Sequence, residues 1–253
     1  MEVWLMTAAA NLCVGALVGL CGVAGFLLPM FYTAALGMSV SESLALSFAA
    51  FILSGALGSL NYRKAGNLNL RFGLKLSAGS LLGAVLGVKL NFIIPEEKVK
   101  LLLYAVVLLS GISILLRKEG GNKEEKRRKF SIEKNLPATL LLGFVTGALC
   151  AMSGAGGPVL VMPLLVAAGI PVRTAVGAAL FNSVFIGIPS AAGYLSQCSL
   201  KTLLPVLLTA LAAHGIGVYW GSKNAVKIRQ GPLKKGVAIF SILIALCKLT
   251  GIF

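Results

Sequence analysis

Two stretches of this sequence decide its architecture: residues 147–157 read GALCAMSGAGG, and residues 15–25 read GALVGLCGVAG. The second copy lies 132 positions after the first, since 147 minus 15 is 132. The same offset relates further identical pairs: Gly37 and Gly169, Val40 and Val172, Gly55 and Gly187, Tyr62 and Tyr194, Gly83 and Gly215. One constant offset over such a span indicates an internal duplication. We therefore predict two repeats, residues 1–116 and 136–253, joined by a charged cytoplasmic linker at 117–135.

The composition indicates the class of protein in which this duplication sits. Hydrophobic residues make up 57% of the chain and charged residues 12%, with a mean hydropathy of +0.91. Soluble domains carry about 25% charged residues, and a helix needs about 20 apolar residues to cross a bilayer. The chain is therefore predicted to be an all-α, multi-pass protein of the cell membrane. Glu2 stands where a signal peptide would carry basic residues, so we expect no cleavable signal.

Each repeat is predicted to contain one glycine-interrupted segment followed by three transmembrane helices. The interrupted segments cover residues 3–37 and 136–169, and the helices cover 42–62, 72–94, 99–116, 174–195, 201–221 and 234–252. If each interrupted segment crosses the bilayer once, the 23 Lys and Arg residues divide 14 to 9 between the two sides. If each segment breaks and returns, they divide 18 to 5. Because basic loops favour the cytoplasm, we predict returning segments, inverted repeats and both termini outside.

Charge and motifs also exclude several classes of function. The net charge of +15 comes from basic residues gathered in short loops, with no basic stripe interleaved with aromatics, so we expect no nucleic-acid partner. The five cysteines show no metal-ligand spacing. The sequence has no paired carboxylates at membrane depth, no Ser/His/Asp set and no nucleotide-binding loop. We therefore expect no enzyme activity, no metal and no cofactor.

The glycine breaks are the candidate binding site. In Ser153-Gly154-Ala155-Gly156-Gly157-Pro158, the proline suits the first position of a new half-helix. The N-terminus of a helix carries a partial positive charge and free N–H groups, which suit an anion. Packing of small residues and hydrogen bonds between helices are the alternative interpretations of these residues. The candidate substrate-binding residues are Gly22, Gly25, Ser47, Ser153, Gly154, Gly156, Gly157 and Asn182.

His214 is the sole histidine and lies within an apolar segment. An ionisable group at membrane depth is a candidate functional group. We predict that it takes part in proton coupling, which makes protons a candidate partner. The alternative is a neutral imidazole that hydrogen-bonds to a neighbouring helix.

The two repeats resemble the TauE/SafE sulfite exporter family. The resemblance rests on a glycine cluster followed by Pro29 or Pro163, and on the segments 43–48 (SLALSF) and 175–180 (AVGAAL). These two segments are similar to the family's Ala-x-Gly-Thr-Ser-Leu motif, of which Ser47 keeps the serine. The resemblance implies export of sulfite, an organosulfonate or a related sulfur anion. A transporter of another small anion, and a non-transport membrane subunit of a larger complex, are the alternatives.

Overall fold

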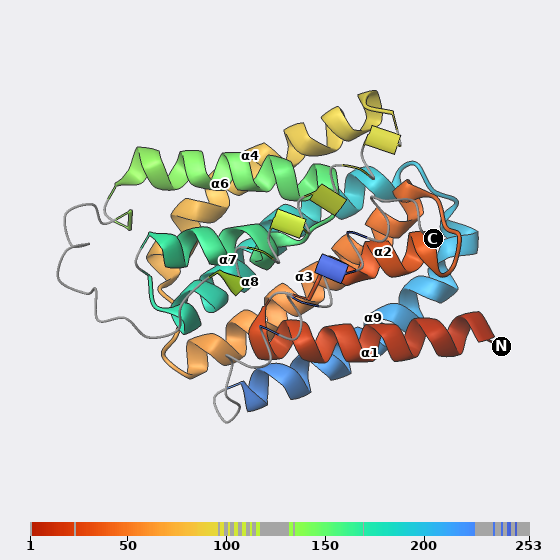
Figure 1. Cartoon of the computed structure of the whole chain (residues 1–253), viewed down its shortest axis with the longest axis horizontal. Helices are drawn as coiled ribbons and strands as arrows, with labels where there is room; N and C mark the ends of the chain where they lie inside the picture. Colours follow the sequence, from red (N-terminus) through yellow and green to blue (C-terminus); the bar gives the residue numbers. More distant parts are fainter. Residues whose placement is uncertain are drawn as a thin grey trace.

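Every regular element in the described part of the chain is a helix (Figure 1). The computed structural model describes residues 2–22, 24–95, 97–98, 101, 104–105, 108–109, 112, 115–116, 132–133, 135–168, 170–225, 235, 239, 242–243 and 246. The expected helices at 99–116 and 234–252 and the linker at 117–135 lie mostly outside these residues.

The helices follow the order expected for two similar halves. They are α1 (Glu2–Cys21), α2 (Leu27–Ala34), α3 (Val40–Lys64), α4 (Leu70–Ile93), α6 (Leu136–Ser153), α7 (Gly157–Ala167), α8 (Val172–Leu195) and α9 (Leu200–Asn224). Within the described residues, six of them are long and apolar enough to cross a membrane: α1, α3, α4, α6, α8 and α9. The prediction of an all-α membrane protein with multiple spans is confirmed.

Local sequence explains where several of these helices begin. The Ser39 hydroxyl accepts a hydrogen bond from the Glu42 N–H, and the Glu42 carboxylate accepts one from the Ser39 N–H, which forms a capping box for α3. Asn69 and Asn135 cap α4 and α6 in a similar way, each accepting from a backbone N–H three residues later. These caps fix the starts of long helices that the apolar runs alone would leave imprecise.

Each interrupted segment forms two helices joined by a short turn. In the first segment, α2 folds back along α1. This is shown by Asn11 Nδ2 in the middle of α1, which donates to the Tyr32 hydroxyl in α2 at 2.7 Å. In the second, α7 packs against α6, and the two run side by side in Figure 1. The returning helices have 8 and 11 residues, which is roughly 12 and 16 Å. Both are too short to cross a hydrocarbon core of about 30 Å.

The two halves are joined by three helix pairs, each with one helix from either half. The α3–α8 pair lies in the middle of the bundle, α4 packs along α6 on one flank, and α1 packs along α9 on the other (Figure 1). Gly143 and Gly147 of α6 face the backbone carbonyls of Leu76 and Ser80. Gly15 of α1 likewise faces the carbonyl of His214. These contacts bear out the packing interpretation for the helix-interior glycines, since small residues let membrane helices approach closely.

The contacts between α3 and α8 describe how the halves are related. A Cβ on Gly55 would lie 2.6 Å from the Leu180 carbonyl oxygen, and one on Gly187 would lie 3.2 Å from the Phe48 carbonyl oxygen. The order along one helix is reversed along the other, so the two helices run antiparallel. Because Gly187 follows Gly55 by the repeat offset, this crossing has the geometry that an inverted duplication needs. Inversion relative to the membrane stays a prediction.

The constant offset fails in α9. Gly83 of α4 packs against the Phe144 backbone of α6. The position equivalent to Phe144 in the first half is Leu12, since 144 minus 132 is 12, and the Leu12 carbonyl faces Gly217. Gly215 instead faces a leucine side chain of α3. The expected correspondence of Gly83 with Gly215 is therefore wrong by two residues, and the structural offset in this helix is 134, from 217 minus 83.

Candidate anion site at the helix breaks

The two breaks converge on one aromatic ring, Phe51, near the middle of α3. A Cβ on Gly25 would lie 2.9 Å from Phe51 Cε1, and a Cβ on Gly156 would lie 3.2 Å from Phe51 Cε2. The first break therefore meets one edge of the ring and the second break meets the other. Phe51 itself is buried. The structure thus brings together two of the glycines that the sequence assigned to the site, with an apolar side chain between them.

Glycine is required at three positions of the breaks by backbone conformation. Gly22, Gly154 and Gly156 have φ angles of 74°, 71° and 73°, in the left-handed region. Residues with a Cβ seldom adopt this region, and it is common where a helix ends. These turns therefore depend on glycine. The half-helices α2 and α7 begin directly after them.

Three backbone N–H groups at the breaks belong to buried glycines and have no hydrogen-bond acceptor among the described residues. Leu27 and Leu28 N–H groups bond back to the carbonyls of Ala24 and Gly25 at 3.0 and 3.1 Å. No acceptor among the described residues takes the N–H of Gly25, Gly156 or Gly157. All three glycines are buried. Free N–H groups near the N-terminus of a helix suit an anion, so these three glycines stay candidate binding residues.

The two candidate serines are engaged with their own helices. The Ser153 hydroxyl donates to the Leu149 carbonyl at 2.7 Å and accepts from the Ala155 N–H at 3.3 Å. The Ser47 hydroxyl donates to the Ser43 carbonyl at 2.7 Å. The sequence interpretation had Ser153 offering its hydroxyl to the anion, whereas in this structure the hydroxyl shapes the turn that carries the break.

Asn182 differs from both serines because its amide has no partner. Its exposed fraction is 0%, and neither Nδ2 nor Oδ1 has a hydrogen bond among the described residues. In α8 it lies between Ala179 and Ser183, which are the residues nearest to Gly157 at the start of α7. A buried amide costs free energy unless it is hydrogen-bonded. Asn182 therefore stays a candidate hydrogen-bonding residue for an anion.

His214 lies away from the breaks, at the interface of α9 with α1. It is fully buried beside the Asn11 backbone, and neither ring nitrogen has a hydrogen bond of good geometry within the described residues. Asn11 Oδ1 and the Thr7 hydroxyl, on the same stretch of α1, are also buried without a partner. Asn11 and Thr7 are not among the residues predicted from the sequence, although an asparagine in an apolar segment is a signal that could have identified this polar cluster.

Two tyrosines tie the tips of the interrupted segments to the central helices. The Tyr62 hydroxyl of α3 donates to the Leu20 carbonyl at 3.3 Å, and the Tyr194 hydroxyl of α8 donates to the Ala151 carbonyl at 2.8 Å. The repeat offset relates these two tyrosines in the sequence, but their hydrogen bonds to the interrupted segments could not be predicted from it. Each tyrosine takes a carbonyl near the end of α1 or α6, where helices leave such groups unpaired.

The buried polar side chains of the described residues include no lysine, arginine, aspartate or glutamate. The breaks therefore offer dipoles and neutral hydrogen-bonding groups within this part of the chain.

Comparison with known proteins agrees with this description. The sequence model of the family described as "Sulfite exporter TauE/SafE" matches residues 4–247. A "Probable membrane transporter protein YdhB" of Bacillus subtilis is 24% identical over 217 residues, covering 85% of this chain and 87% of that protein. A "Probable membrane transporter protein" of Haemophilus influenzae is 24% identical over 253 residues, covering 92% of each chain. No solved structure matches. The chain is thus a multi-pass membrane transporter that belongs to the TauE/SafE sulfite exporter family.

Proposed function

We propose that this protein exports a small sulfur-containing anion, sulfite or an organosulfonate, which binds between the two helix breaks near the middle of the bilayer. The observation that carries the proposal is the convergence of Gly25 and Gly156 on Phe51 with buried N–H groups that lack an acceptor among the described residues. The family supports a sulfur anion as the cargo. Transport then needs no covalent chemistry.

In this proposal the anion takes hydrogen bonds from the backbone at Gly25, Gly156 and Gly157 and from the Asn182 amide. The short turns at Gly22 and Gly154 orient the two half-helices, while Ser153 and Ser47 hold the local backbone. Hydrogen bonds to a charged partner contribute about 1.5–3 kcal/mol each, so a few of them give a moderate affinity. The Phe51 ring occupies the space between the breaks in this state and must move aside when the anion binds.

Inverted repeats provide the route in this proposal. The antiparallel α3–α8 crossing and the returning α1–α2 segment support opposite orientations of the two halves. Two similar halves of opposite orientation can rock around one fixed site and open it to either side in turn.

A screen of purified protein for thermal stabilisation tests the cargo, because a ligand stabilises the folded state to which it binds. The compounds are sulfite, thiosulfate, sulfate, taurine, sulfoacetate and acetate. We expect sulfite or an organosulfonate to raise the melting temperature and acetate to leave it unchanged. Stabilisation by acetate alone would point to a carboxylate transporter and contradict the proposed cargo.

Gly25→Val tests the location of the site. The new side chain points at Phe51 and narrows the space beside the N–H groups, so the stabilising anion should bind roughly ten- to hundredfold more weakly, as expected for the loss of one charge-assisted hydrogen bond. Gly215→Val is the matched control, because its Cβ would meet the Leu53 side chain at 3.0 Å, away from the breaks. Unchanged affinity in a folded Gly25→Val protein would refute the site.

A further inference from the structure

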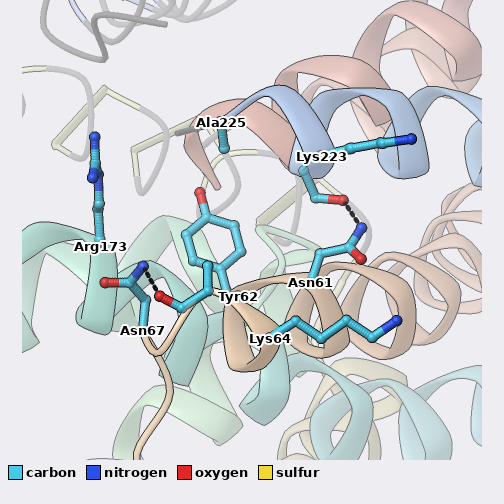
Figure 2. Close-up of a pocket in the computed structure, with 9 residues that line it drawn as sticks. Asn61, Tyr62, Lys64, Asn67, Arg173, Lys223 and Ala225 are labelled. Carbon is cyan, nitrogen blue, oxygen red and sulfur yellow. Dashed lines mark hydrogen bonds between the residues drawn. The ribbon is translucent and has the colours of Figure 1, made fainter. Parts of the chain in front are cut away.

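A cavity of about 270 Å³ opens at the end of the bundle where α3, α8 and α9 come together (Figure 2). This end carries Lys64, Arg173 and Lys223 and is called the basic face below; the charge pattern predicts that it is cytoplasmic. The residues that line the cavity are Asn61, Tyr62, Lys64, Ala65, Asn67, Arg173, Ser222, Lys223 and Ala225.

The chemistry of the cavity favours an anion. Lys64, Arg173 and Lys223 line the cavity, and none of the nine lining residues is acidic. The Lys223 ammonium lies 5.7 Å from the centroid of the Tyr219 ring. Asn61 Nδ2 donates to the Ser222 hydroxyl at 2.7 Å, which links α3 and α9 across the cavity (Figure 2). A hollow lined by charges of one sign concentrates counter-ions from solution.

The inner wall of the cavity adjoins the first helix break. Tyr62, which lines the cavity, donates to the Leu20 carbonyl two residues before Gly22. A Cβ on Gly22 would lie 2.9 Å from Val176 Cγ1, and a Cβ on the next residue of α8, Gly177, would lie 3.2 Å from Tyr62 Cβ. Tyr62 and Val176 therefore form the layer between the cavity and the break.

At the opposite end of the bundle, aromatic side chains of the described residues occupy the equivalent place. Tyr194, the counterpart of Tyr62, stacks on Phe48 with ring centroids 5.8 Å apart and meets the edge of Phe92 at 5.6 Å. Asn91 Nδ2 donates to the Met152 carbonyl there at 2.7 Å. With the offset of 134 in α9, Asn91 corresponds to Ala225, whose smaller side chain leaves room in the cavity.

The positive charges are also not a consequence of the duplication. Subtracting or adding the repeat offset places Ser196 opposite Lys64 and Ser41 opposite Arg173. With the offset of 134, Lys89 corresponds to Lys223. Two of the three charges are thus specific to the basic face.

We propose that the cavity at the basic face is the entrance through which a small oxyanion reaches the breaks, and that this structure is open toward the basic face and closed at the opposite end. The inference rests on the proposed function and adds the route of access. Lys64, Arg173 and Lys223 attract the anion, and a movement of Tyr62 and Val176 admits it to the break. The phosphate of an anionic lipid shares the same chemistry, so the test separates the two sources.

The test uses the full chain in proteoliposomes of phosphatidylcholine and measures the initial rate of radiolabelled sulfite transport. The entrance variant carries Lys64→Gln, Arg173→Gln and Lys223→Gln, and the control carries Arg63→Gln, Arg71→Gln and Lys75→Gln, three residues from the same end of the bundle that do not line the cavity. At low sulfite concentration we expect the entrance variant to be slower by about tenfold or more and less sensitive to salt, and the control to retain the parent rate.

Two further measurements keep the outcomes distinct. Sulfite-induced thermal stabilisation of the entrance variant should equal that of the parent, because the site at the breaks is intact. An Ala65→Cys protein should lose transport when a membrane-impermeant, anionic thiol reagent is added after reconstitution, whereas Arg71→Cys should not.

Equal transport by the entrance variant and the parent overturns the entrance. A defect confined to vesicles that contain phosphatidylglycerol overturns it in favour of a lipid headgroup. A parent protein that neither binds nor transports sulfite in these assays instead counts against sulfite as the proposed cargo.

Discussion

Replacing Asn182 with leucine should make the ligand-free protein more stable and weaken anion binding. The amide is buried, and both of its polar atoms lack a hydrogen bond within the described residues. A buried polar group without a partner costs about 1–3 kcal/mol, and hydrogen bonds between membrane helices average only about 0.6 kcal/mol. Leucine has a similar volume and no polar atoms, so we expect a net gain of about 2 kcal/mol. For a chain of this size, that is a rise of about 4–8 °C in melting temperature.

Asn91→Leu is the matched control for this experiment. Asn91 is also a buried asparagine, but its Nδ2 donates to the Met152 carbonyl at 2.7 Å. Leucine there leaves the carbonyl without that donor, so the melting temperature should fall by a few degrees, the effect of about 1 kcal/mol. The assay is thermal unfolding of both variants in the same detergent, with and without the stabilising anion. The reasoning is refuted if Asn182→Leu lowers the melting temperature as Asn91→Leu does, or if it binds the anion as tightly as the parent.

Two further predictions concern proton coupling and topology. His214→Gln keeps hydrogen-bonding capacity beside Asn11 but cannot titrate, so the pH dependence of transport should change. An unchanged pH profile in proteoliposomes would mean that His214 is only a packing residue. Reporter fusions at residue 1 and residue 253 should both report the outer side of the membrane, as the 18-to-5 division of basic residues requires; a cytoplasmic signal from either end would contradict the predicted parity.

The arrangement of the helices could be read from the sequence to a large extent. The expected helices at 42–62, 72–94, 174–195 and 201–221 correspond to α3, α4, α8 and α9 within three residues at each end. Long apolar runs and flanking caps such as Ser39 and Asn69 determine these boundaries locally. The breaks were also predictable, because Gly22 and Gly154 adopt a backbone conformation that few other residues tolerate.

The parts that depend on long-range packing could not be predicted. Phe51 looks like any apolar residue of a transmembrane helix, and nothing local reveals that its ring separates the two breaks. The hydrogen bond between Asn11 and Tyr32 depends on how α2 folds back on α1. The shift of two residues in α9 could not be seen in the sequence, because a comparison of repeats measures only spacing along the chain. The shift becomes visible only when Gly217 is found packed against α1.

The distribution of charge explains how one protein could both attract an anion and release it. At 4 Å, an opposite charge is worth about 1 kcal/mol in water but about 4 kcal/mol where the effective dielectric constant is 20. A lysine or arginine beside the breaks would therefore hold the anion several kcal/mol more tightly and slow its departure. In our proposal the full charges of Lys64, Arg173 and Lys223 stay at the rim, where water weakens each interaction, and the breaks supply only dipoles. This separation lets the rim raise the local concentration of the anion while the central site keeps an affinity low enough for turnover.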